Sequence, residues 1–188
     1  MRQYIETHYQ IYVIRHIPKM ITWTRVRYRV GQFFHTFWTS FQPVDAACAA
    51  RHLSADMLAL FRRMPRAEQH HGIDVCRKLE AQGYTDPDLL SAALLHDVGK
   101  TLAPPQLWER VIVVLGEYFF PTRARRWSTG EARGLRRGFV IRRLHPQWGA
   151  ALTEQAGASP RTVALIRYHH DPPCDDAELA ILQKVENT

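Results

Sequence analysis

Two adjacent side chains that could bind a metal ion, His96 and Asp97, follow the apolar run Leu94-Leu95. An imidazole offers a neutral nitrogen and a carboxylate offers negative charge, so the two can hold a divalent cation together. The run before them predicts that they are buried, where an unpaired carboxylate costs several kcal/mol. A satisfied polar pair is the alternative, but the sequence favours a cation at this point.

Further histidines stand at spacings that suit the same site. His71, His145 and His169 each lie at or near the end of a predicted helix. Ligands on antiparallel or crossing helices of one bundle can converge on an ion. His170 is a further candidate, whereas we expect His70 to lie outside the site. The remaining histidines are interpreted as surface or packing residues: His8, His16, His35 and His52.

Helical signals dominate the chain from residue 44 onward and would position these ligands. Ser54 can cap a helix that Pro65 ends, and Asp86-Pro87 can open the helix that leads to His96. The latter helix, over 89–98, is apolar nearly all round and should be the buried centre, with Gly99 ending it. The other predicted helices cover 66–82, 105–118, 146–156, 160–170 and 176–187.

Two stretches are harder to assign. Trp108, Val111, Ile112 and Leu115 are expected on the inner side of the helix over 105–118. Residues 121–143 are rich in arginine and are interpreted as a mobile cationic loop that passes into a helix near Glu131. Residues 111–114 and 139–141 are short β-branched exceptions, and no convincing strand is found. The predicted class is all-α.

The ligand spacing also resembles a known superfamily. Gln69-His70-His71-Gly72, followed by Leu94-Leu95-His96-Asp97-Val98-Gly99-Lys100, is similar to the HD-domain metal-dependent phosphohydrolases. The later His145-Pro146-x-x-Gly149-Ala150 and His169-His170 resemble its HD-GYP-like branch, in which additional histidines support a second metal. The resemblance covers about 66–186 and implies an HD-type helical bundle over 44–188. Asp171-Pro172-Pro173 stands where a Gly-Tyr-Pro segment would be, so specificity for cyclic dinucleotides is not implied.

The resemblance also implies roles for the metal ligands. His71, His96 and Asp97 would hold a first ion, and Asp97 would bridge to a second one. The superfamily has an aspartate on its last core helix, where this chain offers Glu186, close to the end of the sequence. Asp171 is left as an unassigned ligand or hydrogen-bond acceptor. The implied cofactor is one or two divalent transition metal ions, Fe, Mn, Zn or Co, and the ligands of the second ion are His145, His169 and His170.

Such a site predicts hydrolysis of a phosphoester in a nucleotide or another small phosphorylated metabolite. Asp97 and Lys100 are the expected catalytic residues. Lys100, Arg142 and Arg143 are the expected substrate-binding residues, through their attraction for phosphate. The alternatives are that Lys100 caps its helix and that the arginines form a solvated surface.

The composition and charge of the chain favour some classes of binding partner over others. A net charge of +7 favours anionic partners, but no nucleic-acid-binding motif occurs. Residues 1–43 form a basic arm that carries half of the chain's aromatic residues and the single acid Glu6. We expect this arm to pack on the domain or in a dimer, with peripheral membrane contact or nucleic-acid binding as the alternatives. The odd cysteine count, with no signal peptide and no transmembrane run, favours a reduced, cytoplasmic protein.

Two other functions remain open from the sequence. A metal-bearing but catalytically weak domain could sense a nucleotide or bind a protein partner, as the substitution by Glu186 would allow. A basic nucleic-acid binder has the charge but lacks a motif. Bound metal with turnover of a phosphate ester separates the hydrolase from both.

Overall fold

The computed structural model describes residues 42–172 and 175–186, and within these ranges the chain is helical with no strand. The all-α prediction is confirmed. The basic aromatic arm predicted for 1–43 lies outside the described residues except for Gln42 and Pro43. Residues 111–114 and 139–141 lie in helices. None of the described helices is long and apolar enough to cross a membrane.

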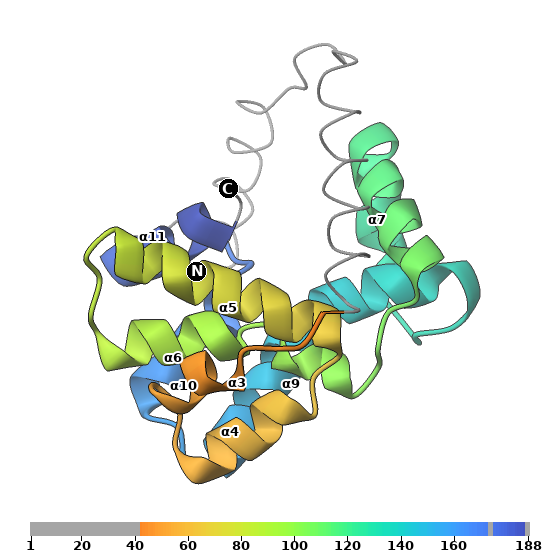
Figure 1. The fold of residues 1–188 in the computed structure, drawn as a ribbon. Helices are drawn as coiled ribbons and strands as arrows, with labels where there is room; N and C mark the ends of the chain where they lie inside the picture. The colour runs from red at the N-terminus through yellow and green to blue at the C-terminus, as the bar shows by residue number, and fades with distance from the viewer. Residues whose placement is uncertain (1–41, 173–174, 187–188) are drawn as a thin grey trace.

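The helices follow one another in a bundle (Figure 1). Their bounds are α3 Ala46–Ala50, α4 Ala55–Arg62, α5 Arg66–Ala81, α6 Pro87–Leu95, η1 Val98–Thr101, α7 Leu107–Phe119, α8 Pro121–Trp127, η2 Gly134–Arg136, α9 Arg137–Gln155, α10 Pro160–Tyr168 and α11 Ala177–Glu186.

Short polar side chains start several of these helices. The Ser54 hydroxyl accepts a hydrogen bond from the Met57 amide at the start of α4, and the Asp86 carboxylate accepts one from the Leu89 amide in α6. Ser159 caps α10 in the same way. Each cap satisfies an amide that has no partner inside its helix and is worth about 1 kcal/mol. These local signals explain why the predicted starts of α4, α6 and α10 agree with the structure.

The core lies between α5, α6, α10 and α11. Leu79, Leu94, Leu95, Ile166 and Leu182 are fully buried there, and every residue from Leu89 to Leu95 in α6 is buried. Each fully buried leucine or isoleucine stabilises the fold by about 1.5–3 kcal/mol. Helix α6 is therefore the central helix, as its apolar composition predicts.

Two glycines allow the backbones around α6 to approach closely. A Cβ atom on Gly72 would lie 2.7 Å from the Leu94 carbonyl oxygen, and one on Gly99 would lie 2.0 Å from the His145 carbonyl oxygen. Any larger residue would push α5 away from α6, or η1 away from α9. Helix α6 ends at Leu95, earlier than the predicted end at residue 98, so that His96 and Asp97 occupy a turn before η1.

The prediction for residues 121–156 is wrong in two respects. Residues 121–127 form α8 rather than a loop, and α9 begins at Arg137 and continues through Pro146 instead of starting there. Proline inside a helix removes one backbone hydrogen bond. Phe139, Val140 and Ile141 are buried, however, and this packing keeps α9 continuous across Pro146.

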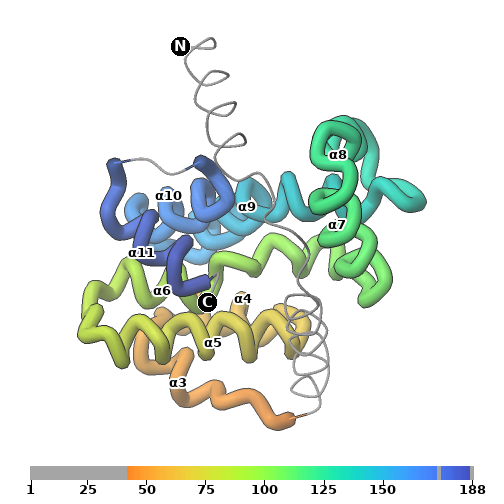
Figure 2. The backbone as a smooth tube through the Cα atoms, turned by 90° about the horizontal axis from the view of Figure 1, so that it is seen from above, coloured from red at the N-terminus to blue at the C-terminus, as the bar shows by residue number. Residues whose placement is uncertain are grey.

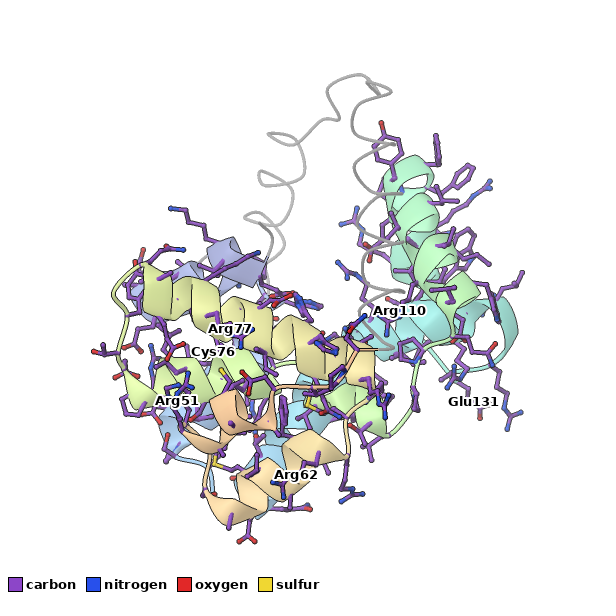
Figure 3. All side chains as sticks on the ribbon, viewed as in Figure 1. Arg51, Arg62, Cys76, Arg77, Arg110 and Glu131 are labelled. Atoms are coloured by element: carbon purple, nitrogen blue, oxygen red, sulfur yellow. The ribbon has the colours of Figure 1, made fainter. Side chains whose placement is uncertain are left out.

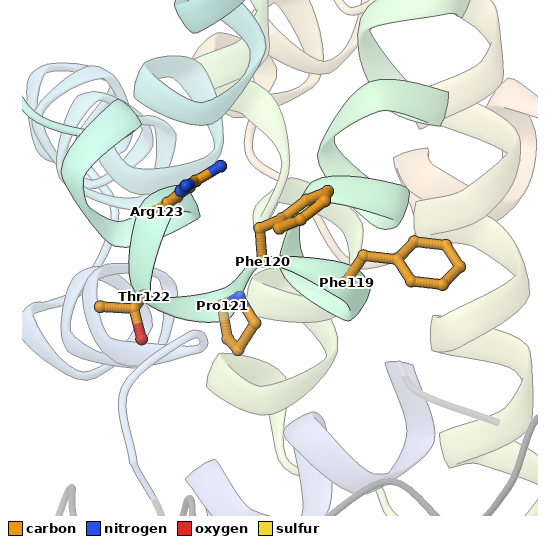
Figure 4. A pocket seen from close by; sticks show the side chains of 5 residues that line it. All are labelled: Phe119, Phe120, Pro121, Thr122 and Arg123. Atoms are coloured by element: carbon orange, nitrogen blue, oxygen red, sulfur yellow. The ribbon is translucent and has the colours of Figure 1, made fainter.

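Helices α7 and α8 lie beside the bundle (Figure 2). Trp108, Val111 and Leu115, which were expected to face inward, are 44%, 42% and 49% exposed. That expectation is wrong because α7 packs mainly on α8 and α9, through a small cluster that includes Val113 and Phe139. Figure 4 shows the turn between α7 and α8, where the residues lining a shallow pocket are Phe119, Phe120, Pro121, Thr122 and Arg123.

Candidate metal centre

Side chains of metal-ligating types from four places in the chain lie close together. Two groups each bring three candidate ligand atoms within 4.8 Å of one another. The groups adjoin, because the ring centroids of His96 and His169 are 5.2 Å apart. The first group is His71 from α5 with His96 and Asp97 after α6, and the second is His145 from α9 with His169 and His170 at the end of α10.

Asp97 lies between the two groups. Its Oδ2 atom is 3.6 Å from His96 Nε2, and its Oδ1 atom is 3.2 Å from His145 Nε2. The carboxylate therefore directs one oxygen toward each group. This geometry suits a ligand shared by two ions.

Backbone carbonyls orient three of the imidazoles. The Nδ1 atoms of His96, His145 and His169 lie 2.9, 3.1 and 2.7 Å from the carbonyl oxygens of Ala93, Ile141 and Ile166 respectively. A carbonyl oxygen can only accept, so each Nδ1 carries the proton and donates it. Each Nε2 then presents a lone pair to the site, which is how histidine ligands are commonly held.

These lone pairs face other acceptors. His145 Nε2 lies 3.3 Å from His169 Nε2, and neither nitrogen has a proton to share when both Nδ1 atoms donate. In the described part of the chain, His96 Nε2 and Glu186 Oε2 are buried without a hydrogen-bond partner. A buried unsatisfied polar atom costs about 1–3 kcal/mol. A cation would satisfy all of these atoms, so the donor set fits a metal ion.

Burial keeps three of the histidines neutral. It lowers the pKa of His71 to about 4. Burial likewise lowers the pKa of His145 to about 4, although Asp97 acts against it, and it holds the pKa of His169 well below its usual value. Neutral imidazoles can coordinate a metal near pH 7 without first losing a proton.

The two carboxylates of the centre remain ionised. Burial alone would raise both pKa values, but the Lys100 ammonium holds the pKa of Asp97 well below its usual value. The pKa of Glu186 is also lowered, because His170 donates to its carboxylate. Glu186 Oε1 is 3.5 Å from His170 Nε2. The last carboxylate of the chain therefore reaches the cluster.

A chain of ion pairs lies beside the ligands and was missed from the sequence. Lys100 Nζ donates to Asp97 Oδ2 at 2.6 Å and to Glu68 Oε2 at 3.3 Å, and Arg110 pairs with the other oxygen of Glu68. Arg110 belongs to α7 and is labelled in Figure 3, so its pair with Glu68 joins α7 to α5. The spacing of Glu68 three residues before His71 on α5 could have indicated it, since residues at this spacing share a helix face.

The ion pairs set the charges of these groups. Burial disfavours the charged form of Lys100, yet Asp97 and Glu68 raise its pKa above the usual value. Burial raises the pKa of Glu68 in spite of its two cationic neighbours. The side chains of Lys100 and Arg110 are 19% and 32% exposed, whereas that of Glu68 is 3% exposed. The two cations therefore lie on the solvent side of the buried carboxylates.

Other candidate residues have partners away from the cluster. His70 contacts the Gln42 carbonyl oxygen at 3.2 Å, as expected for a residue outside the site. Arg142 pairs with Glu117 at 2.6 Å, and Arg143 Nε donates to the Ser128 carbonyl at 2.7 Å. The two predicted substrate-binding arginines are thus engaged elsewhere. Asp171 lies next to His170, and burial raises its pKa.

Comparisons with family models, curated proteins and solved structures found no match for this chain. Two histidine groups joined by an aspartate, with buried acceptor atoms facing one another, form a candidate metal centre.

Proposed function

We propose that this protein is a divalent-metal-dependent phosphohydrolase of the HD-domain type, acting on a phosphoester of a nucleotide or another small phosphorylated metabolite. The observation that carries the proposal is the position of Asp97 between two histidine groups in which the Nε2 atoms of His96, His145 and His169 have no hydrogen to donate. A merely structural polar cluster would pair donors with acceptors. In this cluster, acceptor atoms lie against other acceptor atoms.

The proposed ligands form two sets that share one residue. His71, His96, Asp97 and Glu186 would hold one ion, and Asp97 would be shared with an ion held by His145, His169 and His170. Mixed imidazole and carboxylate ligands are compatible with Fe, Mn, Zn or Co. Such ions, when bound, polarise a phosphoryl oxygen and lower the pKa of water.

The chain's own cations would receive the phosphate. Lys100 and Arg110 are charged, partly exposed and anchored through Glu68 beside Asp97. Guanidinium and ammonium groups attract phosphate oxygens, and holding them in place beforehand reduces the entropy lost when substrate binds. We assign substrate binding to Lys100 and Arg110 rather than to Arg142 and Arg143. Lys100 also orients Asp97 by donating to its Oδ2.

The experiment is metal analysis of anaerobically purified protein together with a panel of phosphomonoesters and phosphodiesters. We expect bound transition metal and turnover of at least one ester, with turnover reduced more than about 100-fold in Asp97→Asn. Arg142→Gln is the matched control because Arg142 pairs with Glu117 outside the cluster, and its turnover should be unchanged. Bound metal without turnover on the whole panel would favour the nucleotide-sensing alternative.

A further inference from the structure

A second group of ligand-type side chains lies on α3 and α5. Cys48 of α3 and His52, just after it, are four residues apart, as are Cys76 and Glu80 on α5. Cys76 and Glu80 therefore share one face of α5. The two pairs face each other, because His52 Nε2 lies 3.1 Å from Glu80 Oε1. None of these residues belongs to the centre around Asp97.

The candidate ligand atoms converge. The sulfurs of Cys48 and Cys76 and a carboxylate oxygen of Glu80 lie within 4.8 Å of one another. His52 is not in this group of three, but its Nε2 atom lies 3.1 Å from Glu80 Oε1. Both cysteines are fully buried and neither forms a disulfide, whereas the side chains of His52 and Glu80 are 16% and 33% exposed. The two cysteine sulfurs thus lie on the core side of the group, and His52 and Glu80 lie on its solvent side.

Secondary contacts hold this group in position. Ser91 of α6 donates to the His52 carbonyl oxygen at 3.0 Å, which ties the segment after α3 to the central helix. Arg51 Nη2 lies 3.6 Å from both Cys48 Sγ and Glu80 Oε1. Figure 3 labels Arg51 and Cys76 on this side of the molecule.

We propose that Cys48, His52, Cys76 and Glu80 form a structural zinc site with two sulfur, one nitrogen and one oxygen ligand. Four protein ligands around Zn²⁺ leave no open position, which is typical of structural rather than catalytic sites. Thiolate ligands favour zinc over the hard cations magnesium and calcium. The site would fasten the short helix α3, which has only five residues, to α5.

The positive charge of the neighbouring Arg51 supports this set of four ligands. Two thiolates and one carboxylate exceed the charge of a divalent ion by one negative charge, and the neutral imidazole adds none. The Arg51 guanidinium, in contact with a sulfur and a carboxylate oxygen of the site, supplies the balancing positive charge. Groups that hydrogen-bond to metal ligands in this way commonly contribute about 10–100-fold to metal affinity. The competing explanation is a pair of ordinary buried thiols.

Cobalt substitution tests the proposal without relying on activity. Co²⁺ bound by thiolates gives a sulfur-to-metal charge-transfer absorption, and no sulfur belongs to the proposed ligand set around Asp97. We expect the full chain to develop this absorption when enough Co²⁺ is added to fill the centre around Asp97 as well, and to lose it when Zn²⁺ is added. Cys48→Ser and Cys76→Ser should abolish it, whereas Cys174→Ser, which removes the remaining thiol, should retain it.

Variants on the exposed side guard against misfolding of the cysteine variants. Glu80→Gln should weaken Zn²⁺ binding at this site more than about 10-fold, and Arg51→Gln about 10-fold, with the fold retained by circular dichroism. The proposal is overturned if the wild-type chain shows no sulfur-to-cobalt absorption, or if Cys48→Ser retains it. A Cys48–Cys76 disulfide in freshly purified, zinc-free protein would overturn it as well.

Discussion

Asp97 Oδ1 lies 3.2 Å from His145 Nε2, and this contact joins the turn after α6 to α9. His145 is buried, and its Nδ1 donates to the Ile141 carbonyl, so its Nε2 cannot donate to the carboxylate while the ring is neutral. Two acceptors at this distance repel unless a cation lies with them. The arrangement could therefore hold a cation between Asp97 and the two histidine groups.

Glu68→Gln should lower stability more than a matched surface change. The variant weakens the ion pairs that the buried Glu68 carboxylate forms with Lys100 and Arg110. We expect the free energy of unfolding to fall by about 1–3 kcal/mol in urea denaturation. Glu131→Gln serves as the control because Glu131 and Arg133 form an exposed ion pair, which is worth at most about 1 kcal/mol. Equal effects of the two substitutions would show that the Glu68 pairs contribute nothing beyond a surface contact.

Gly99→Ala should destabilise the fold and disturb the site together. The new methyl group would lie 2.0 Å from the His145 carbonyl oxygen, so η1 and α9 must separate, at a cost of about 1–3 kcal/mol. Gly149→Ala is the comparison, since its nearest neighbour would be the Gly99 nitrogen at 3.2 Å. Thermal unfolding and metal titration of both variants test this. A fully stable Gly99→Ala protein with unchanged metal affinity would contradict the packing described for η1.

The metal-free protein should lose stability as the pH falls from about 6.5 to about 4. Burial lowers the pKa of His71 and His145 from 6.5 to about 4, so within this window the unfolded chain binds protons that the folded chain does not. Unfolding is therefore favoured as the pH decreases, and the contribution to stability is complete above 6.5. Urea denaturation of chelator-treated protein across this range measures the effect.

His145→Gln provides the control for this pH dependence. Removing one of the buried imidazoles should make the decline in stability between pH 6.5 and pH 4 shallower, whatever the variant does to stability at neutral pH. If the wild-type protein and His145→Gln showed the same slope, the buried imidazole would not account for the pH dependence.

Local signals predicted much of this fold. Ser54, Asp86 and Ser159 marked helix starts, and the apolar run over 89–95 marked the central helix, because capping and burial act at short range in sequence. The continuity of α9 through Pro146 was not predictable in this way. It depends on the burial of Phe139 to Ile141 against other elements, which no local pattern expresses.

In the candidate site, too, some residues could be recognised from the sequence and others could not. The histidines and Asp97 are recognisable by residue type, and the structure brings them together. Glu68 and Arg110 were missed because their pairing crosses from α5 to α7, and an isolated glutamate or arginine on a helix is usually interpreted as solvated. His52 was interpreted as a surface or packing residue, and its contact with Glu80 was missed for a similar reason. Only the docking of α3 on α5 brings the two side chains together.

The number of transition metal ions per chain, compared between the wild-type protein and Asp97→Asn, tests the central claim most directly. Both proteins would be purified anaerobically and analysed by elemental mass spectrometry, with circular dichroism to confirm that the variant folds. The account predicts that the wild-type chain holds more ions than the variant, because Asp97 contributes an oxygen to each histidine group. Equal metal content in two folded proteins, or a wild-type chain without transition metal, would contradict it.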